Sequence, residues 1–233
     1  MAAFAQKTDI VVLRSRTLRL RRRSQLGPFR PAGYDSAKRA FDMIVCLLLL
    51  PVVLPLIALC GLIHWFTSPG PIFFLQWRTG LRGKRFRMFK LRTMLRDAEA
   101  LKENYAHLNE LSWPDFKIKN DPRITRVGRF LRKTSLDELP QIFNVLLGNM
   151  SMVGPRPTSF PLESYELWQT ERLEVLPGIT GLWQVSGRSD TDLNERLLLD
   201  IEYISRRSIS FDCILLLLTV RAVIGGRGAV CSV

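Results

Sequence analysis

The stretch from Met43 to Ile63, MIVCLLLLPVVLPLIALCGLI, contains 21 residues without a charged side chain. A helix needs about 20 apolar residues to cross the hydrocarbon core of a membrane, so this stretch predicts a membrane helix. Pro51 and Pro55 lie near its middle, and each removes a backbone donor and clashes with the preceding turn. We therefore expect a break or a sharp kink of the helix near these two prolines.

The two flanks of this apolar run carry charge of the same sign. Residues 1–39 hold ten Lys/Arg and two Asp, and residues 64–92 hold seven Lys/Arg and no acid. The positive-inside tendency places both flanks on the cytoplasmic side. A re-entrant helix, which enters the membrane, bends and returns to the same face, satisfies both the prolines and the charges. A kinked spanning helix is the alternative.

Three parts follow from the position of this run: a basic, flexible arm over residues 1–35, the membrane helix over residues 36–66 and a cytoplasmic domain over residues 67–233. Ser36 is the expected N-cap of the membrane helix. The Arg-rich arm is expected to lie near anionic lipid. The later apolar stretch at residues 213–220 is only eight residues long, so it predicts a buried or interface-lying helix rather than a second span.

The net charge of +13 is unevenly distributed along the chain. Residues 1–133 hold 26 Lys/Arg against 9 Asp/Glu, whereas residues 134–233 hold 8 against 12. A basic half indicates a polyanionic partner, which can be nucleic acid, anionic lipid or a phosphorylated substrate. A basic membrane adaptor or a nucleic-acid-binding module is therefore an alternative to an enzyme. No helix-turn-helix or stacking-aromatic pattern supports nucleic acid, and the cysteine and histidine spacing does not predict a zinc site.

The periodicity of the remaining chain predicts a mostly helical α+β domain. A short hairpin is expected where residues 71–78 and 84–92 flank a glycine turn. Amphipathic helices are expected over residues 95–111 and over the basic segment 121–135. Further helices are expected from Asp137 to a stop at Gly148, and over residues 159–174 and 192–207. The segment VGPRP at 153–157 predicts a stiff loop that presents Arg156, and PGITGLWQVSGR at 177–188 predicts a glycine-punctuated loop and strand.

The segment SLDELPQ, residues 135–141, has two interpretations. In the first, Ser135 caps a helix and Glu138 closes a capping box, with Asp137 and Glu138 in the first turn, where the helix dipole favours anions. In the second, the two carboxylates do chemistry: a carboxylate at a helix N-terminus among cations stays ionised and can act as a nucleophile or a Mg²⁺ ligand. No P-loop and no GxGxxG cradle is present.

Cationic residues in loops and strands favour the second interpretation. Arginine forks suit the geometry of phosphate groups. Arginines beside a carboxylate pair in a membrane-associated chain indicate phosphoryl chemistry on a lipid phosphate. The cations in question are Lys90, Arg92, Arg132, Arg156 and Arg188.

From about residue 37 to its C-terminus the chain resembles the bacterial sugar transferases, the monotopic phosphoglycosyl transferases. Six blocks carry the resemblance in order: KRAFD, GPIFFLQWRTG, FRMFKLRTM, TSLDELPQIFNVLLGNMSMVGPRP, PGITGLWQVSGR and LDIEYI. The resemblance implies a re-entrant helix and a small catalytic domain with membrane-parallel helices. It also implies that a carboxylate attacks the β-phosphate of a UDP-sugar, releases UMP and passes the sugar phosphate to polyprenol phosphate, with Mg²⁺ required.

Carried over to this chain, the resemblance makes Asp137 the nucleophile and Glu138 its partner in metal binding or proton handling. It assigns substrate binding to Lys90, Arg92, Arg132, Arg156, Gln184 and Arg188, the last of these through the nucleotide. One departure concerns the helix break, which is often Ser-Pro in the family and is Leu54-Pro55 here.

The expected partners are a UDP-sugar, polyprenol (undecaprenyl) phosphate and anionic lipids, and not nucleic acid. The expected location is the cytoplasmic (inner) membrane, with the catalytic domain facing the cytoplasm, in exopolysaccharide, O-antigen or capsule assembly. The identity of the sugar, with glucose or galactose as the family-level expectation, and the oligomeric state, with a homo-oligomer as one option, stay open at this point.

Overall fold

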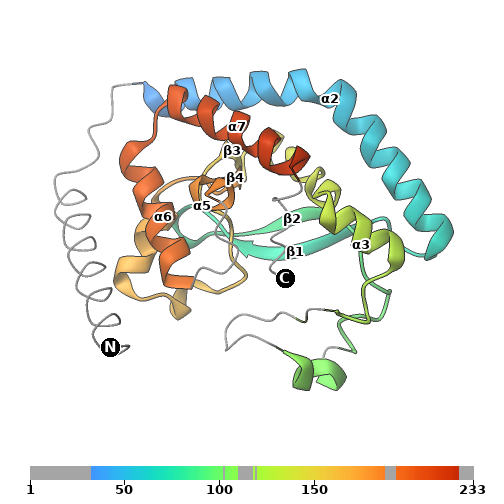
Figure 1. Cartoon of the computed structure of the whole chain (residues 1–233). Helices are drawn as coiled ribbons and strands as arrows, with labels where there is room; N and C mark the ends of the chain where they lie inside the picture. The colour runs from blue at the N-terminus through green and yellow to red at the C-terminus, as the bar shows by residue number, and fades with distance from the viewer. Residues whose placement is uncertain (1–32, 102, 110–117, 119, 187–192, 226–233) are drawn as a thin grey trace, which may run out of the picture.

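The structure is a computed structural model that describes residues 33–101, 103–109, 118, 120–186 and 193–225. One long helix, α2 (Tyr34–Thr67), runs along one side of the molecule, bends partway and descends at its edge (Figure 1). The remaining elements lie within this bend: a two-stranded hairpin, a second small sheet and several short helices. The expected α+β architecture, mostly helical with a short hairpin, agrees with this arrangement.

Helix α2 continues through Pro51 and Pro55, so the expected break is a bend within one helix (Figure 1). The helix begins at Tyr34 after Gly33, whose φ is 91°, and not at a cap formed by Ser36. Among the described residues it is the one helix that is long and apolar enough to cross a membrane. Its re-entrant path remains a prediction.

The two faces of α2 differ in burial. Cys46, Val53, Ile57 and Cys60 are buried against the domain, at the three- to seven-residue spacing of one helix face. Most of the remaining surface is apolar and exposed, which costs free energy in water and is stable in lipid. The exposed apolar residues of this helix include Ile44, Leu47, Leu48, Val52, Leu59, Leu62 and Phe66.

The charged residues of the KRAFD block attach the first half of α2 to the domain. Lys38 Nζ lies 2.6 Å from Asp42 Oδ1 and 3.1 Å from Asp212 Oδ2. Tyr203 Oη donates to Asp212 Oδ1 at 2.8 Å. Arg39 donates to the carbonyls of residues 145 and 146 at 2.6 and 2.9 Å, which satisfies the end of α4 (Gln141–Leu146). These buried contacts tie α2 to α4 and to α7 (Ile209–Ile224).

The predicted hairpin is confirmed. Strand β1 (Phe73–Thr79) pairs antiparallel with β2 (Arg85–Leu91), and a short 3₁₀ turn, η1 (Leu81–Gly83), joins them. In β2 alternate side chains are buried, as a sheet with one covered face requires. Asn144 of α4 holds this strand by accepting from Phe89 N at 2.9 Å and donating to the carbonyl of residue 87 at 2.7 Å.

A second, parallel sheet pairs β3 (Ser151–Val153) with β4 (Gly178–Thr180). The strand in PGITGLWQVSGR was predicted, whereas its partner β3 was not. Gly154 and Gly178 allow the two backbones to approach, since a Cβ on Gly178 would lie 2.1 Å from Gly154 N. The buried core surrounds this sheet and includes Leu131, Ile142, Val145, Met150, Val153 and Leu215.

Helices cover the rest of the domain. The basic segment forms α3 (Arg126–Lys133), which Thr125 caps by accepting from Gly128 N at 2.8 Å. The predicted helix at 192–207 is α6 (Leu193–Arg206), and the apolar stretch near the C-terminus lies within α7. The short helix α5 (Leu182–Val185) follows β4, and α4 ends before Gly148, whose φ of 79° stops the helix as expected.

Two helix predictions were wrong. Residues 96–101 form turns and η2 (Glu103–Leu108) is 3₁₀, so no α-helix spans the described part of 95–111. The segment 159–174 contains the 3₁₀ turns η4 (Leu162–Ser164) and η5 (Leu167–Glu174) instead of an α-helix. Of the proposed three parts, nearly all of the arm at 1–35 lies outside the described residues.

Candidate active site

The carboxylate pair lies on a 3₁₀ turn, η3 (Leu136–Glu138), between α3 and α4. Ser135 adopts a left-handed φ of 57° and makes no side-chain cap bond to this turn, so the predicted capping box is wrong. The physical reason is that the side chain of Glu138 turns toward cations instead of toward the backbone of Ser135. The turn sets the two neighbouring carboxylates, Asp137 and Glu138, in different surroundings.

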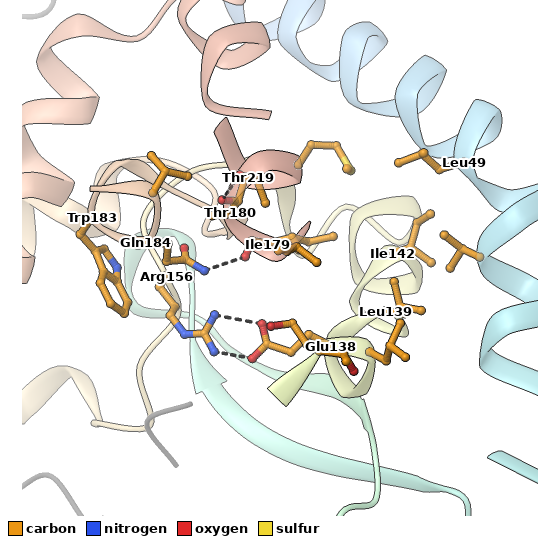
Figure 2. Close-up of a pocket in the computed structure, with 18 residues that line it drawn as sticks. Leu49, Glu138, Leu139, Ile142, Arg156, Ile179, Thr180, Trp183, Gln184 and Thr219 are labelled. Carbon is orange, nitrogen blue, oxygen red and sulfur yellow. Dashed lines mark hydrogen bonds and ion pairs between the residues drawn. The ribbon is translucent and has the colours of Figure 1, made fainter. Parts of the chain in front are cut away.

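Glu138 is held by two cations from distant segments. Arg156 binds it with both terminal guanidinium nitrogens, Nη1 donating to Oε2 at 3.1 Å and Nη2 donating to Oε1 (Figure 2). Lys90 Nζ donates to Oε1 at 3.2 Å. Burial alone would raise the pKa of Glu138, but Arg156 and Lys90 outweigh it and hold that pKa well below its usual range. Glu138 therefore stays ionised and joins β2 to the VGPRP loop.

Asp137 has a different environment. Its side chain is 2% exposed, and its Oδ1 has no hydrogen-bond partner among the described residues. Burial raises the pKa of Asp137 to about 6, with Lys90 acting against the rise and the charge of Glu138 adding to it. Nearby cations lower the pKa of a carboxylate, but here desolvation is the larger effect. At neutral pH the group is still mainly ionised, and it is poorly solvated.

The predicted cations fall into three groups. Lys90, Arg132 and Arg156 surround the pair, and each lowers the pKa of Asp137. Arg132 is oriented by Thr93, whose Oγ1 accepts from its Nε at 2.9 Å. Arg92 lies elsewhere: its guanidinium donates to the carbonyls of residues 68 and 69, at the turn that follows α2. Arg188 lies outside the described residues.

An apolar cavity of about 250 Å³ begins at Glu138 and Arg156 and extends between α2, α4 and α7 (Figure 2). Leu49 and Val53 of the long helix form part of its wall. Gln184 also lines it, with Nε2 donating to the carbonyl of Ile179 at 3.1 Å (Figure 2). Its other lining residues include Leu136, Leu139, Ile142, Ile179, Val185, Ala222 and Val223. The cavity thus has an apolar body and one charged end.

Four residues near the pair were not singled out from the sequence: Arg78, Thr93, Arg172 and Asp200. Arg172 Nη2 donates to Asp200 Oδ2 at 2.6 Å and also to the carbonyl of Arg156, so this buried pair supports the VGPRP loop. Three of the four lie in the quoted blocks QWRTG, KLRTM and LDIEYI, and this was the available signal. Arg172 lies in none of them.

The carboxylate pair limits where a metal ion can bind. Within the described ranges no group of three or more His, Cys, Asp or Glu side chains could hold one. The free Oδ1 of Asp137 fits a cation, whereas both oxygens of Glu138 are engaged by Arg156 and Lys90. A Mg²⁺ ion here fits the arrangement in which one or two carboxylates and substrate phosphates supply the ligands.

Comparison with known proteins identifies the family. Residues 33–226 match the family described as Bacterial sugar transferase. The chain is 44% identical over 200 residues to "Undecaprenyl-phosphate galactose phosphotransferase" of Salmonella typhimurium (82% of this chain, 41% of the relative). It is 40% identical over 196 residues to "UDP-glucose:undecaprenyl-phosphate glucose-1-phosphate transferase" of Escherichia coli (78% and 39%).

A third relative, "Exopolysaccharide production protein ExoY" of Rhizobium meliloti, is 37% identical over 210 residues, which is 88% of this chain and 92% of the relative. The chain therefore spans about two fifths of the length of the first two relatives and nearly all of the third. The match with the family covers most of the chain and includes the carboxylate turn, the hairpin and α2. The chain belongs to the bacterial sugar transferase family.

Proposed function

We propose that the protein transfers a sugar 1-phosphate from a UDP-sugar to polyprenyl phosphate through a covalent intermediate on Asp137. The observation that carries this proposal is the contrast within the carboxylate pair. Glu138 is fixed by two cations, whereas Asp137 is buried, has a free oxygen and has a pKa of about 6. A poorly solvated carboxylate that is ionised at neutral pH is a suitable nucleophile.

The first half of the reaction requires attack on an anion. An oxygen of Asp137 forms a bond to the β-phosphorus, and the bond from that phosphorus to the bridging oxygen breaks. The electron pair leaves with UMP, and no proton transfer is needed. Lys90, Arg132 and Arg156 reduce the repulsion between the carboxylate and the diphosphate, and they stabilise the charge on the transferring phosphoryl group.

The second half of the reaction regenerates the free carboxylate of Asp137. A phosphate oxygen of the polyprenyl phosphate attacks the same phosphorus, the bond to Asp137 breaks, and the product is a polyprenyl diphosphate sugar. The apolar cavity supports this acceptor, because its body is apolar, its walls include α2 and its charged end lies at Glu138 and Arg156 (Figure 2). An isoprenoid chain can lie there with its phosphate at the arginine.

Mg²⁺ is part of the proposal. Asp137 Oδ1 and the substrate phosphates would hold it, and the ion would neutralise charge on the diphosphate. Glu138 contributes by holding Lys90 and Arg156 in place beside Asp137, rather than as a ligand.

We also infer that α2 is re-entrant and that the domain faces the cytoplasm. The bend in α2 and the positive charge on both of its flanks support this topology (Figure 1). Cysteines introduced at residues 34 and 70 should be labelled by an impermeant reagent from the same side of the membrane. Labelling from opposite sides would reject the re-entrant path.

The chemical test uses the full chain in nanodiscs with Mg²⁺ and a panel of UDP-sugars, UDP-glucose and UDP-galactose first. Without acceptor, wild-type protein should release about one UMP per active site and gain the mass of one sugar phosphate on Asp137. Asp137→Asn should release none, whereas Asp97→Asn, at an exposed position, should behave as wild type. Near-normal UMP release by Asp137→Asn would refute the proposed mechanism.

A further inference from the structure

A second cavity, polar and of about 60 Å³, adjoins the apolar one, since Arg156 and Trp183 line both. Its walls come from β1, from the loop after β3, from η5 and from α6. It is rich in guanidinium groups and contains one carboxylate. The charged residues that line it are Arg78, Arg156, Arg172, Arg196 and Asp200.

Most of these charges already have partners. Arg172 and Asp200 form a buried pair, with Arg172 Nη2 and Nε 2.6 and 3.1 Å from Asp200 Oδ2. Arg156 is bonded to Glu138. Arg196 lies over the ring of Trp183, 5.4 Å from its centroid. These contacts hold the charged side chains of the wall in place. Arg78 differs from them, because it forms no ion pair within the described residues.

Arg78 is 7% exposed, and its Nε has no hydrogen-bond partner among the described residues. Its Nη2 donates to the neutral side chain of Gln76 at 2.5 Å, and no carboxylate in the described ranges lies within ion-pair distance. Burial, followed by the nearby charge of Arg156, lowers the pKa of Arg78 to about 10, so the group is still charged at neutral pH. The charge of Glu138 offsets this effect only in part. A buried cation without a direct ion pair is costly, and a bound anion would relieve this cost.

The position of Arg78 is well determined by the hairpin. It lies in β1 opposite Phe86 of β2, and the next residue, Thr79, donates from its backbone to the carbonyl of Thr158 at 2.9 Å. Arg85 bonds both segments, donating to the hydroxyl of Thr79 at the end of β1 and to the carbonyl of Ser159 in the loop, both at 2.8 Å. Arg78 is therefore a preorganised donor, held beside the arginine that contacts the carboxylate pair.

We propose that this polar cavity is the subsite for the α-phosphate of the UDP-sugar, the phosphate that leaves in UMP, and that Arg78 binds it. The inference rests on the proposed function, which requires the β-phosphate at Asp137 and the acceptor in the apolar cavity. The cationic cavity adjoins both positions through Arg156, so it lies where the second phosphate of the diphosphate can bind. When the bond between the β-phosphorus and the bridging oxygen breaks, that oxygen takes the electron pair, and Arg78 stabilises its charge.

The test measures UMP binding to the full chain in nanodiscs by calorimetry. Arg78→Gln removes a charge-assisted hydrogen bond from a buried site, so we expect it to weaken the binding of UMP about ten- to a hundredfold. Arg78→Lys keeps the positive charge but not the two parallel donors of the guanidinium, and it should lose less affinity for UMP. Arg87→Gln is the matched control, because Arg87 is an exposed arginine of the same hairpin that, within the described residues, neither lines the cavity nor bonds the loop that forms its wall. Its UMP affinity should stay within about threefold of wild type, as for a partly exposed contact.

Two further ligands identify which phosphate Arg78 binds. Uridine, which lacks the phosphate, should compete equally well in wild type and Arg78→Gln, and the KM for a short polyprenyl phosphate should be unchanged. Unchanged UMP affinity in Arg78→Gln would overturn the proposal. A raised KM for polyprenyl phosphate together with normal UMP affinity would overturn it as well. If Arg78→Gln does not fold, the same comparison with Arg78→Lys decides. Weak UMP binding in Arg78→Gln together with UMP release by Asp137→Asn would refute the covalent mechanism and leave this subsite standing.

Discussion

Replacement of the proposed nucleophile should stabilise the protein, in a way that depends on pH. Asp137 is buried, and folding raises its pKa from 3.8 to about 6, which means that the ionised carboxylate is less stable in the folded chain than in the unfolded one. Asp137→Asn keeps the size and shape of the side chain and removes the charge. The variant should therefore be inactive and, at neutral pH, harder to unfold.

The size of this gain follows from the pKa shift. Two units, at 1.36 kcal/mol each, correspond to about 3 kcal/mol. Between pH 4 and 6 the folded state binds more protons than the unfolded state, so wild-type stability falls as pH rises through this window. The advantage of Asp137→Asn is then nearly absent at pH 4 and complete at pH 7.5. For a chain of this length it corresponds to roughly 6–12 °C in Tm.

Thermal unfolding of both proteins in nanodiscs, followed by tryptophan fluorescence from pH 4 to 8, measures this difference. The buffer should contain EDTA, because a cation at Asp137 Oδ1 would stabilise the ionised form. The buried amide of the variant has its own cost, which does not vary with pH, so the pH-dependent part of the difference is the decisive quantity. Asp97→Asn, at an exposed position, is the control variant. A difference in Tm that is constant with pH, or that shrinks as pH rises, would refute the argument.

Three other substitutions probe the framework around the site. Lys38→Met leaves the buried carboxylates of Asp42 and Asp212 without their cation and should cost about 3–5 kcal/mol, measured as a lower Tm. Val53→Trp fills the apolar cavity and should raise the KM for polyprenyl phosphate at least about tenfold, since a well-placed large side chain excludes the isoprenoid, while acceptor-free UMP release is unchanged. Gly178→Ala places a Cβ 2.1 Å from a backbone nitrogen of the paired segment and should abolish folded expression, measured by size-exclusion chromatography. The matched controls are Lys84→Met and Leu59→Trp, both at exposed positions. An equal effect of a control and its partner substitution, or soluble folded Gly178→Ala, would contradict these expectations.

The elements that sequence predicted well are those that local chemistry determines. The hairpin has two extended runs around a glycine turn, and the register of β1 and β2 follows from that turn. The VGPRP loop is stiff because its two prolines exclude a helix. The bend of α2 follows from the prolines within it, and α6 from its own apolar periodicity.

The failures occurred where distant groups compete for the local backbone. The segment 95–111 has helical periodicity, but Arg123 donates to the carbonyl of Ala98 at 3.1 Å and its own carbonyl accepts from Leu95 N at 2.9 Å. The carbonyl of Ala98 is one that a helix would use, and the bond from Leu95 N ties the start of the segment to the backbone at Arg123. In the same way, Glu138 did not close a capping box with Ser135, because Arg156 and Lys90 lie within reach and form stronger charged bonds.

The different surroundings of the two adjacent carboxylates could not be predicted from the segment SLDELPQ alone, because distant residues create them. Two neighbours in one segment share the same local sequence, and only their partners distinguish them. Glu138 receives Lys90 from the hairpin and Arg156 from the loop after β3, and it becomes a fixed structural anion. Asp137 is buried by the same elements and forms no direct ion pair within the described residues, so its ionised form is destabilised. The contacts that hold the site together at Glu138 thus leave Asp137 as the less stabilised anion, which supports the proposal that Asp137 and not Glu138 is the nucleophile.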